Sequence, residues 1–147
     1  MDILYTLGYS GLTPEAILRA AVRLNAIVAD IRISPRSRHP MWNGPKMQAA
    51  WGDRYMHIPE LGNLNYKGKR GEDVILADAE AGCARVLELL TRHSVILLCA
   101  CSDWRTCHRR DAAALIAQRS NAEPIHLSSS EVRRFADSDG ELQPPLL

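Results

Sequence analysis

The residues most able to do chemistry lie in two short segments, each at the carboxyl end of an expected strand. Asp30-Ile31-Arg32 follows one apolar run, and the segment from Cys99 to Arg110 follows the most apolar run of the chain. Both segments combine ionisable groups with arginines, which bind carboxylates and phosphates through two parallel hydrogen bonds. Ligands bind outside the carboxyl ends of the strands in an open parallel sheet, so we expect one shared site there.

Cys99 has two interpretations. At the end of a buried strand it is typical of a core thiol, whereas nearby arginines and a helix start would make it a reactive thiolate. The spacing Cys-x5-Arg-Thr that begins at Cys99 matches cysteine phosphatases, but the intervening loop lacks a glycine and contains Asp103, which would repel an anion. The catalytic residues that we assign are Cys99, His108 and Asp30, with Asp30 orienting a neighbour.

Four potential metal ligands form the pattern Cys-x-Cys-x5-Cys-His, which consists of Cys99, Cys101, Cys107 and His108. Structural zinc sites usually combine Cys-x2–4-Cys with a distant second pair of ligands. A single residue between the first two cysteines directs both sulfurs to one side only if the strand continues past Cys99. The spacing therefore predicts no metal, and we expect no cofactor.

Arginines near both segments favour an anionic ligand. Arg109 lies at the start of an expected helix, where free N–H groups attract anions and where a cation needs an anion nearby, so it either holds a ligand or pairs with Asp30. Arg32 either holds the same ligand or pairs with Asp30, because the two lie on the same side of a strand. The other residues assigned to binding are Ser10, Ser34, Arg36, His57, Glu60 and Cys107. A solvated surface loop is the alternative for residues 34–39.

Strands and helices alternate along the chain. Apolar runs predict strands at 3–7, 26–29, 55–58, 95–100 and 125–127. Helical patterns predict helices at 14–24, 46–51, 74–92 and 108–119, and the polar segment 63–72 predicts an exposed loop. This order predicts an α/β fold, in which a mostly parallel sheet carries helices on both faces of a single compact domain.

Length and composition set further limits. The 147 residues, 46% of them hydrophobic, suit one domain over residues 1–127, followed by a polar C-terminal extension over 128–147 that we expect to be partly disordered. The net charge of +1 argues against a surface that wraps DNA, although a local patch for nucleic acid stays open. Without a long apolar run or a basic leader, the chain is predicted to be cytoplasmic, with no membrane partner and with reduced thiols.

The sequence resembles the domain-of-unknown-function family 488 over roughly residues 3–127. The matching segments, in order, are Tyr5–Ser10, Val28–Ser37, Pro59–Gly62, Leu97–Ala100 and Cys107–Arg109. Tyr9 stands where this family often has His. The resemblance implies an α/β fold and a shared polar site, and the family has no settled activity to carry over.

The leading functional hypothesis is an enzyme, a hydrolase or a transferase, that acts on a phosphorylated or otherwise anionic small molecule or nucleotide. The first alternative is a module that binds a nucleotide or nucleic acid in the same pocket without turnover. The second alternative is a rhodanese-like sulfur carrier that uses Cys99 or Cys107.

Overall fold

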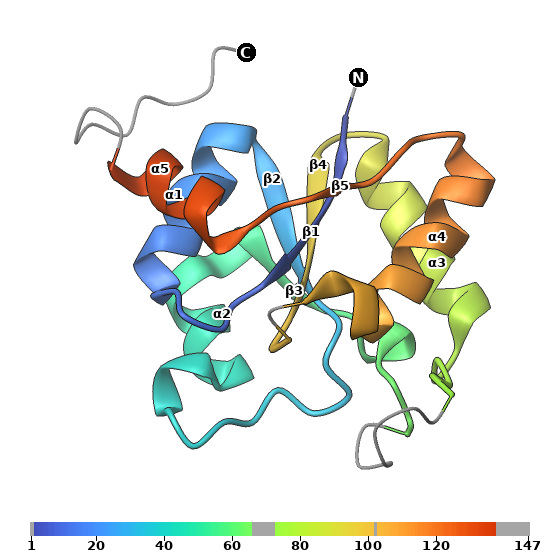
Figure 1. Ribbon diagram of the computed structural model, residues 1–147, viewed down its shortest axis with the longest axis horizontal. Helices are drawn as coiled ribbons and strands as arrows, with labels where there is room; N and C mark the ends of the chain where they lie inside the picture. The colour runs from blue at the N-terminus through green and yellow to red at the C-terminus, as the bar shows by residue number, and fades with distance from the viewer. Residues whose placement is uncertain (1, 66–72, 102, 138–147) are drawn as a thin grey trace.

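A five-stranded parallel sheet forms the centre of the protein. The computed structural model describes residues 2–65, 73–101 and 103–137 (Figure 1). The strands are β1 (Leu4–Gly8), β2 (Ala26–Asp30), β3 (Tyr55–His57), β4 (Ser94–Cys99) and β5 (Ile125–His126), in the order β3-β2-β4-β1-β5. All pairings are parallel, as the strand–helix alternation predicts.

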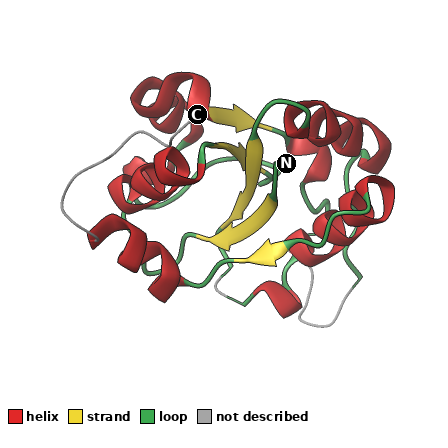
Figure 2. Ribbon diagram, turned by 90° about the horizontal axis from the view of Figure 1, so that it is seen from above, coloured by secondary structure: helices red, strands yellow, loops and turns green. Residues whose placement is uncertain are grey.

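Helices cover both faces of this sheet (Figure 2). In the described part of the chain they are α1 (Pro14–Leu24), α2 (Gly44–Trp51), α3 (Ala79–Leu90), α4 (His108–Ser120) and α5 (Ser129–Asp137). Alternate residues of β4 enter different cores: Ile96 packs in the core with α1, α2 and α5, and Leu97 in the core with α3 and α4. The expected α/β class is therefore confirmed.

Local side chains set the ends of the helices. Thr13 Oγ1 accepts a hydrogen bond from the Ala16 N–H at 3.2 Å, which caps the start of α1. Helix α3 begins at Ala79 instead of the expected residue 74. Asp78 caps that helix through Oδ1, and Leu76 before it pairs with Asn63 in an isolated bridge. Of the polar segment 63–72, residues 66–72 lie outside the described residues.

The chain beyond residue 127 adds to the fold. Helix α5 packs on α1, with Val132 buried and Phe135 packed against the same core. Because these two apolar residues are three positions apart, they lie on one side of the helix. Arg133 Nη2 also donates to the Gly11 carbonyl at 2.6 Å. Helix α5, which lies within the expected C-terminal extension, therefore packs on the domain, while residues 138–147 lie outside the described part.

The strand register brings the ends of neighbouring strands level. Gly8 of β1 pairs with Cys99 of β4, and Asp30 of β2 pairs with both Leu98 and His57. The segments that follow these residues therefore leave the sheet at one edge. Among the described residues, no helix has the length and apolar character needed to cross a bilayer.

Candidate functional site

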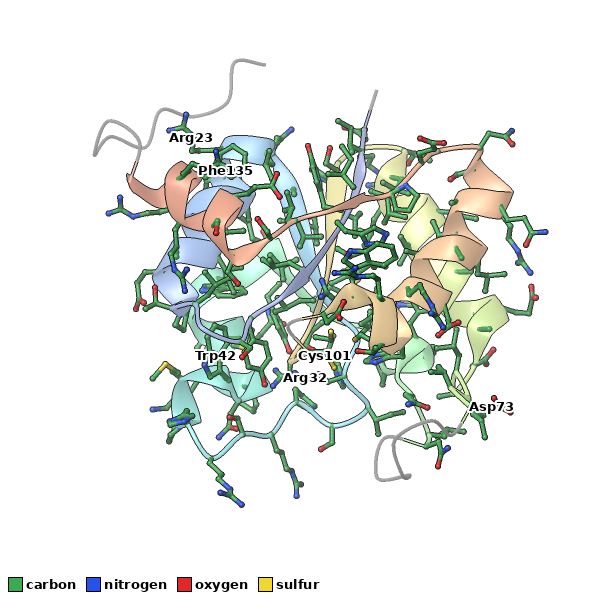
Figure 3. The ribbon with its side chains drawn as sticks, in the orientation of Figure 1. Arg23, Arg32, Trp42, Asp73, Cys101 and Phe135 are labelled. Atoms are coloured by element: carbon green, nitrogen blue, oxygen red, sulfur yellow. The ribbon has the colours of Figure 1, made fainter. Side chains whose placement is uncertain are left out.

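The two segments singled out in the sequence meet at the carboxyl edge of the sheet. Beyond the strand ends, the Tyr9 N–H donates to the Cys99 carbonyl at 2.9 Å, and the Ile31 N–H donates to the Leu98 carbonyl at 3.0 Å. Figure 3 shows Cys101 and Arg32 at this same edge. The sheet therefore places the thiols after β4 beside the charged residues after β2.

Asp30 and Arg32 form a buried ion pair. Arg32 Nε donates to Asp30 Oδ1 at 2.9 Å, and its Nη2 donates to Oδ2 at 2.7 Å. The hydroxyl of Tyr55, on the neighbouring strand β3, donates to Oδ2 at 2.6 Å. Burial, followed by the neighbouring carboxylate, raises the pKa of Tyr55, so its phenol stays protonated and keeps donating. Arg32 is thus the partner of Asp30, one of the two roles that the sequence left open.

The remaining contacts of Arg32 hold its side chain and backbone in place. Nη2 also donates to the Trp42 carbonyl at 2.7 Å, and Nη1 donates to the Tyr9 hydroxyl at 3.2 Å. The rings of Tyr9 and Trp42 stack with centroids 4.2 Å apart. His57 Nε2 lies 2.7 Å from the Arg32 carbonyl and donates to it, because a carbonyl only accepts. This buried network orders the loop that follows β2.

Three thiols gather on the other side of the site. The Sγ atoms of Cys99, Cys101 and Cys107 all lie within 4.8 Å of one another, with 2.8 Å between Cys99 and Cys107. Cys99 and Cys107 are buried, whereas Cys101 is exposed. The sulfurs therefore lie together although β4 ends at Cys99, as expected from the sequence, and strand alternation does not bring them to one side. The chain does not continue as a strand after Cys99 but turns back toward the start of α4.

Gly8 permits this turn. A Cβ atom at Gly8 would lie 1.5 Å from the Cys101 carbonyl oxygen, so the backbone after β4 rests directly on the last residue of β1. Any side chain at this position would push Cys101 outward. The absence of one brings the exposed thiol over the two buried thiols.

Arg109 lies beside the thiols and is only 1% exposed. Its Nη2 donates to the Cys101 carbonyl at 3.2 Å, and its Nη1 donates to Thr6 Oγ1 at 3.4 Å. The ion pair that the structure shows for the Asp30 carboxylate is with Arg32. Arg109 therefore places a buried positive charge next to the cysteines.

The surroundings of the three thiols favour Cys101 as the one that ionises. Hydrogen bonds from Cys107 and then Cys99 lower the pKa of Cys101 far below that of a free thiol, and the charge of Arg109 acts in the same direction. The hydrogen bond to Cys101 raises the pKa of Cys107 to about 11. The hydrogen bond from Cys99 to Cys101 likewise raises the pKa of Cys99. The exposed sulfur is therefore the one best placed to be ionised.

His108, the first residue of α4, has a defined tautomer. Its Nε2 lies 3.0 Å from the Ile31 carbonyl and must carry the hydrogen, since a carbonyl only accepts. Burial lowers the pKa of His108, which favours the neutral ring. Nδ1 then presents a lone pair at 3.6 Å from Cys107 Sγ.

The other residues assigned from the sequence lie on the surface or in contacts within the fold. Ser10, Ser34 and Arg36 are exposed, and the Arg36 N–H closes a turn on the Ser34 carbonyl at 2.8 Å. Glu60 pairs with Arg85 of α3 at 2.8 Å, a contact within the fold. Sequence reasoning gave no role to Tyr55 and did not place Cys101 among the catalytic or binding residues, although both belong to the site.

The fold and the site define a class: a compact α/β protein with a cysteine–histidine–arginine cluster at the carboxyl edge of a parallel sheet. The family model for DUF488, a domain of unknown function, matches residues 17–116. The chain therefore belongs to the DUF488 family. Searches among curated proteins and among solved structures each found no match.

Proposed function

We propose that this protein is an enzyme that uses a cysteine thiol to act on a phosphorylated or otherwise anionic small molecule or nucleotide. One observation carries the proposal: the exposed Cys101 thiol lies over two buried thiols, beside a buried arginine. The sequence favoured Cys99 as the nucleophile. The burial of Cys99 favours Cys101 instead, because a nucleophile must reach its substrate.

The surrounding groups suit a two-step displacement. The Cys101 sulfur attacks an electrophilic centre, and the bond to the leaving group breaks as Cys107 supplies the proton that this group takes away. In a hydrolase, water then cleaves the sulfur-linked intermediate and returns a proton to Cys107. In a transferase, an acceptor hydroxyl takes the place of water. His108, neutral and facing Cys107, orients that thiol.

The preference for an anionic substrate rests on charge. Arg109 is buried beside Cys101, and α4 directs the N–H groups of its first turn toward the same edge of the sheet. These positive groups offset the charge of the thiolate and also that of an incoming anion. Cytoplasmic location and binding of nucleic acid remain predictions from the sequence alone.

A rhodanese-like sulfur carrier is the second candidate, and the neighbouring thiols favour it. In this reaction the Cys101 thiolate attacks the outer sulfur of thiosulfate, sulfite leaves, and a persulfide remains on Cys101. An acceptor such as cyanide then removes the outer sulfur and restores the thiolate. The buried thiols of Cys99 and Cys107 hydrogen-bond the charged sulfur in the thiolate form.

Turnover assays with one matched pair of variants test both candidates. Phosphate monoesters, nucleotides and thiosulfate with cyanide are offered to the wild type, to Cys101→Ala and to Cys83→Ala, which removes a buried thiol of α3. We expect turnover in the wild type and in Cys83→Ala, and none in Cys101→Ala. Released phosphate or sulfite distinguishes the two candidates. Turnover that survives in Cys101→Ala, or none in the wild type with the whole panel, contradicts the proposal.

A further inference from the structure

We propose that Cys99, Cys101, Cys107 and His108 form a binding site for a thiophilic divalent cation such as zinc. The inference goes beyond the catalytic role and rests on three sulfurs that lie together and on an imidazole nitrogen beside one of them. The chain supplies three sulfurs and one imidazole nitrogen, a donor set that tetrahedral zinc accepts.

The three sulfurs lie close to the separations that such an ion requires. Zinc–sulfur bonds of about 2.3 Å at tetrahedral angles place the sulfurs about 3.8 Å apart. Here Cys99 and Cys107 Sγ are 2.8 Å apart, and all three Sγ atoms fall within 4.8 Å. Side-chain shifts of about 1 Å therefore bring all three into bonding range without a change in the sheet.

His108, whose Nδ1 lies beside Cys107 Sγ, is the fourth donor that we propose. Zinc bonds of about 2.3 Å to sulfur and about 2.0 Å to nitrogen at a tetrahedral angle place these two ligand atoms about 3.5 Å apart. Nδ1 of His108 lies 3.6 Å from Cys107 Sγ. Its other ring nitrogen donates to the Ile31 carbonyl at 3.0 Å, the kind of partner that orients metal-binding histidines. The nitrogen with the available lone pair is therefore the one that faces Cys107 Sγ.

Charge and access also fit a bound ion. Three thiolates and one divalent cation leave a net charge of −1. The buried guanidinium of Arg109, whose Nη2 lies 3.2 Å from the Cys101 carbonyl oxygen, offsets this charge. Cys99 and Cys107 are buried, which keeps water from competing for the ion. Cys101 is exposed and provides the route of entry.

Metal binding and the proposed reaction use the same Cys101 sulfur, so a bound ion blocks the nucleophile. The metal-free protein is then the form that carries out thiol chemistry. The two proposals can fail separately, because cobalt or zinc binding is measured without turnover and turnover is measured in chelator.

Cobalt(II) reports on the site directly, because thiolate ligation gives charge-transfer bands and tetrahedral coordination gives intense visible bands. Reduced, metal-free full-length protein is titrated with Co(II), followed by Zn(II). We expect saturation at one equivalent per chain and loss of the bands as zinc displaces cobalt. Cys101→Ser and His108→Ala should each weaken cobalt binding by at least about tenfold.

The controls keep the test interpretable. Cys83→Ser alters a thiol of α3 outside the cluster, so its titration should match that of the wild type. Cys101 is exposed, so Cys101→Ser should retain the wild-type circular dichroism spectrum. The proposal is overturned if the wild type gives no tetrahedral cobalt bands, or if Cys83→Ser loses them as Cys101→Ser does.

Discussion

Replacing Arg32 by methionine tests the structural core of the site. The Asp30 carboxylate is 0% exposed and receives two hydrogen bonds from the Arg32 guanidinium, at 2.9 and 2.7 Å. Arg32→Met keeps an unbranched side chain but leaves this carboxylate with Tyr55 as its only remaining side-chain donor among the described contacts. Breaking a buried pair in this way costs about 3–5 kcal/mol of unfolding free energy.

That loss is large enough to measure in two ways. For a protein of this size it lowers the melting temperature by about 6–20 °C, at about 2–4 °C per kcal/mol. Urea unfolding followed by tryptophan fluorescence gives the free energy itself. Arg85→Met is the matched control, because the Arg85–Glu60 pair is 39% and 28% exposed and should contribute about 1 kcal/mol or less.

A small effect of Arg32→Met would refute the reasoning. If the variant loses less than about 1 kcal/mol, Arg32 does not neutralise a buried Asp30 charge. Its guanidinium would then be available for the ligand-binding role that the sequence also allowed. A loss close to that of Arg85→Met would have the same meaning.

Three further predictions follow from individual contacts. Tyr55→Phe removes one hydrogen bond to the Asp30 carboxylate and should cost about 1.5–3 kcal/mol in urea unfolding; no measurable loss would show that the bond is not made. Gly8→Ala places a Cβ against the Cys101 carbonyl oxygen, so it should destabilise the protein by about 1–3 kcal/mol or more in thermal melts and alter the alkylation rate of Cys101. Burial, with a smaller contribution from Arg109, lowers the pKa of His126, so NMR should show its ring titrating below about 6.5. The contribution of the neutral ring to the free energy of unfolding should be complete above that pH and should be lost as the pH falls to the folded-state pKa.

Much of the fold could be predicted from apolar runs and helix caps. The runs at β1, β2 and β4 and the Thr13 cap of α1 appear almost as expected, because burial and capping are local properties of the sequence. Helix α5 could not be predicted from composition, because its segment is polar and mainly two apolar residues, three positions apart, face the core. Helix α3 begins after the Asp78 cap. The helical pattern of apolar residues runs through Asp78 without a break, so it does not indicate this start.

The sequence predicts which segments form the site, but it does not predict most of the contacts between their side chains. Parallel strand ends identify the segments after β2 and β4, and the alternation of side chains predicts that Asp30 and Arg32 can pair. The convergence of the three sulfurs depends on Gly8, which belongs to a strand far away in sequence. Tyr55 reaches Asp30 only because β3 pairs with β2, a neighbour relation that no local pattern reveals.

Cys101 is the accessible, reactive thiol that we assign to the cluster, and alkylation tests this assignment most directly. Reduced, metal-free native protein is treated with iodoacetamide at pH 7, and peptide mass spectrometry follows each cysteine over time. We predict that Cys101 reacts at least about tenfold faster than Cys83, Cys99 and Cys107, all of which are buried. Modification of Cys99 or Cys107 before Cys101, or equal rates at all four cysteines, would contradict the account.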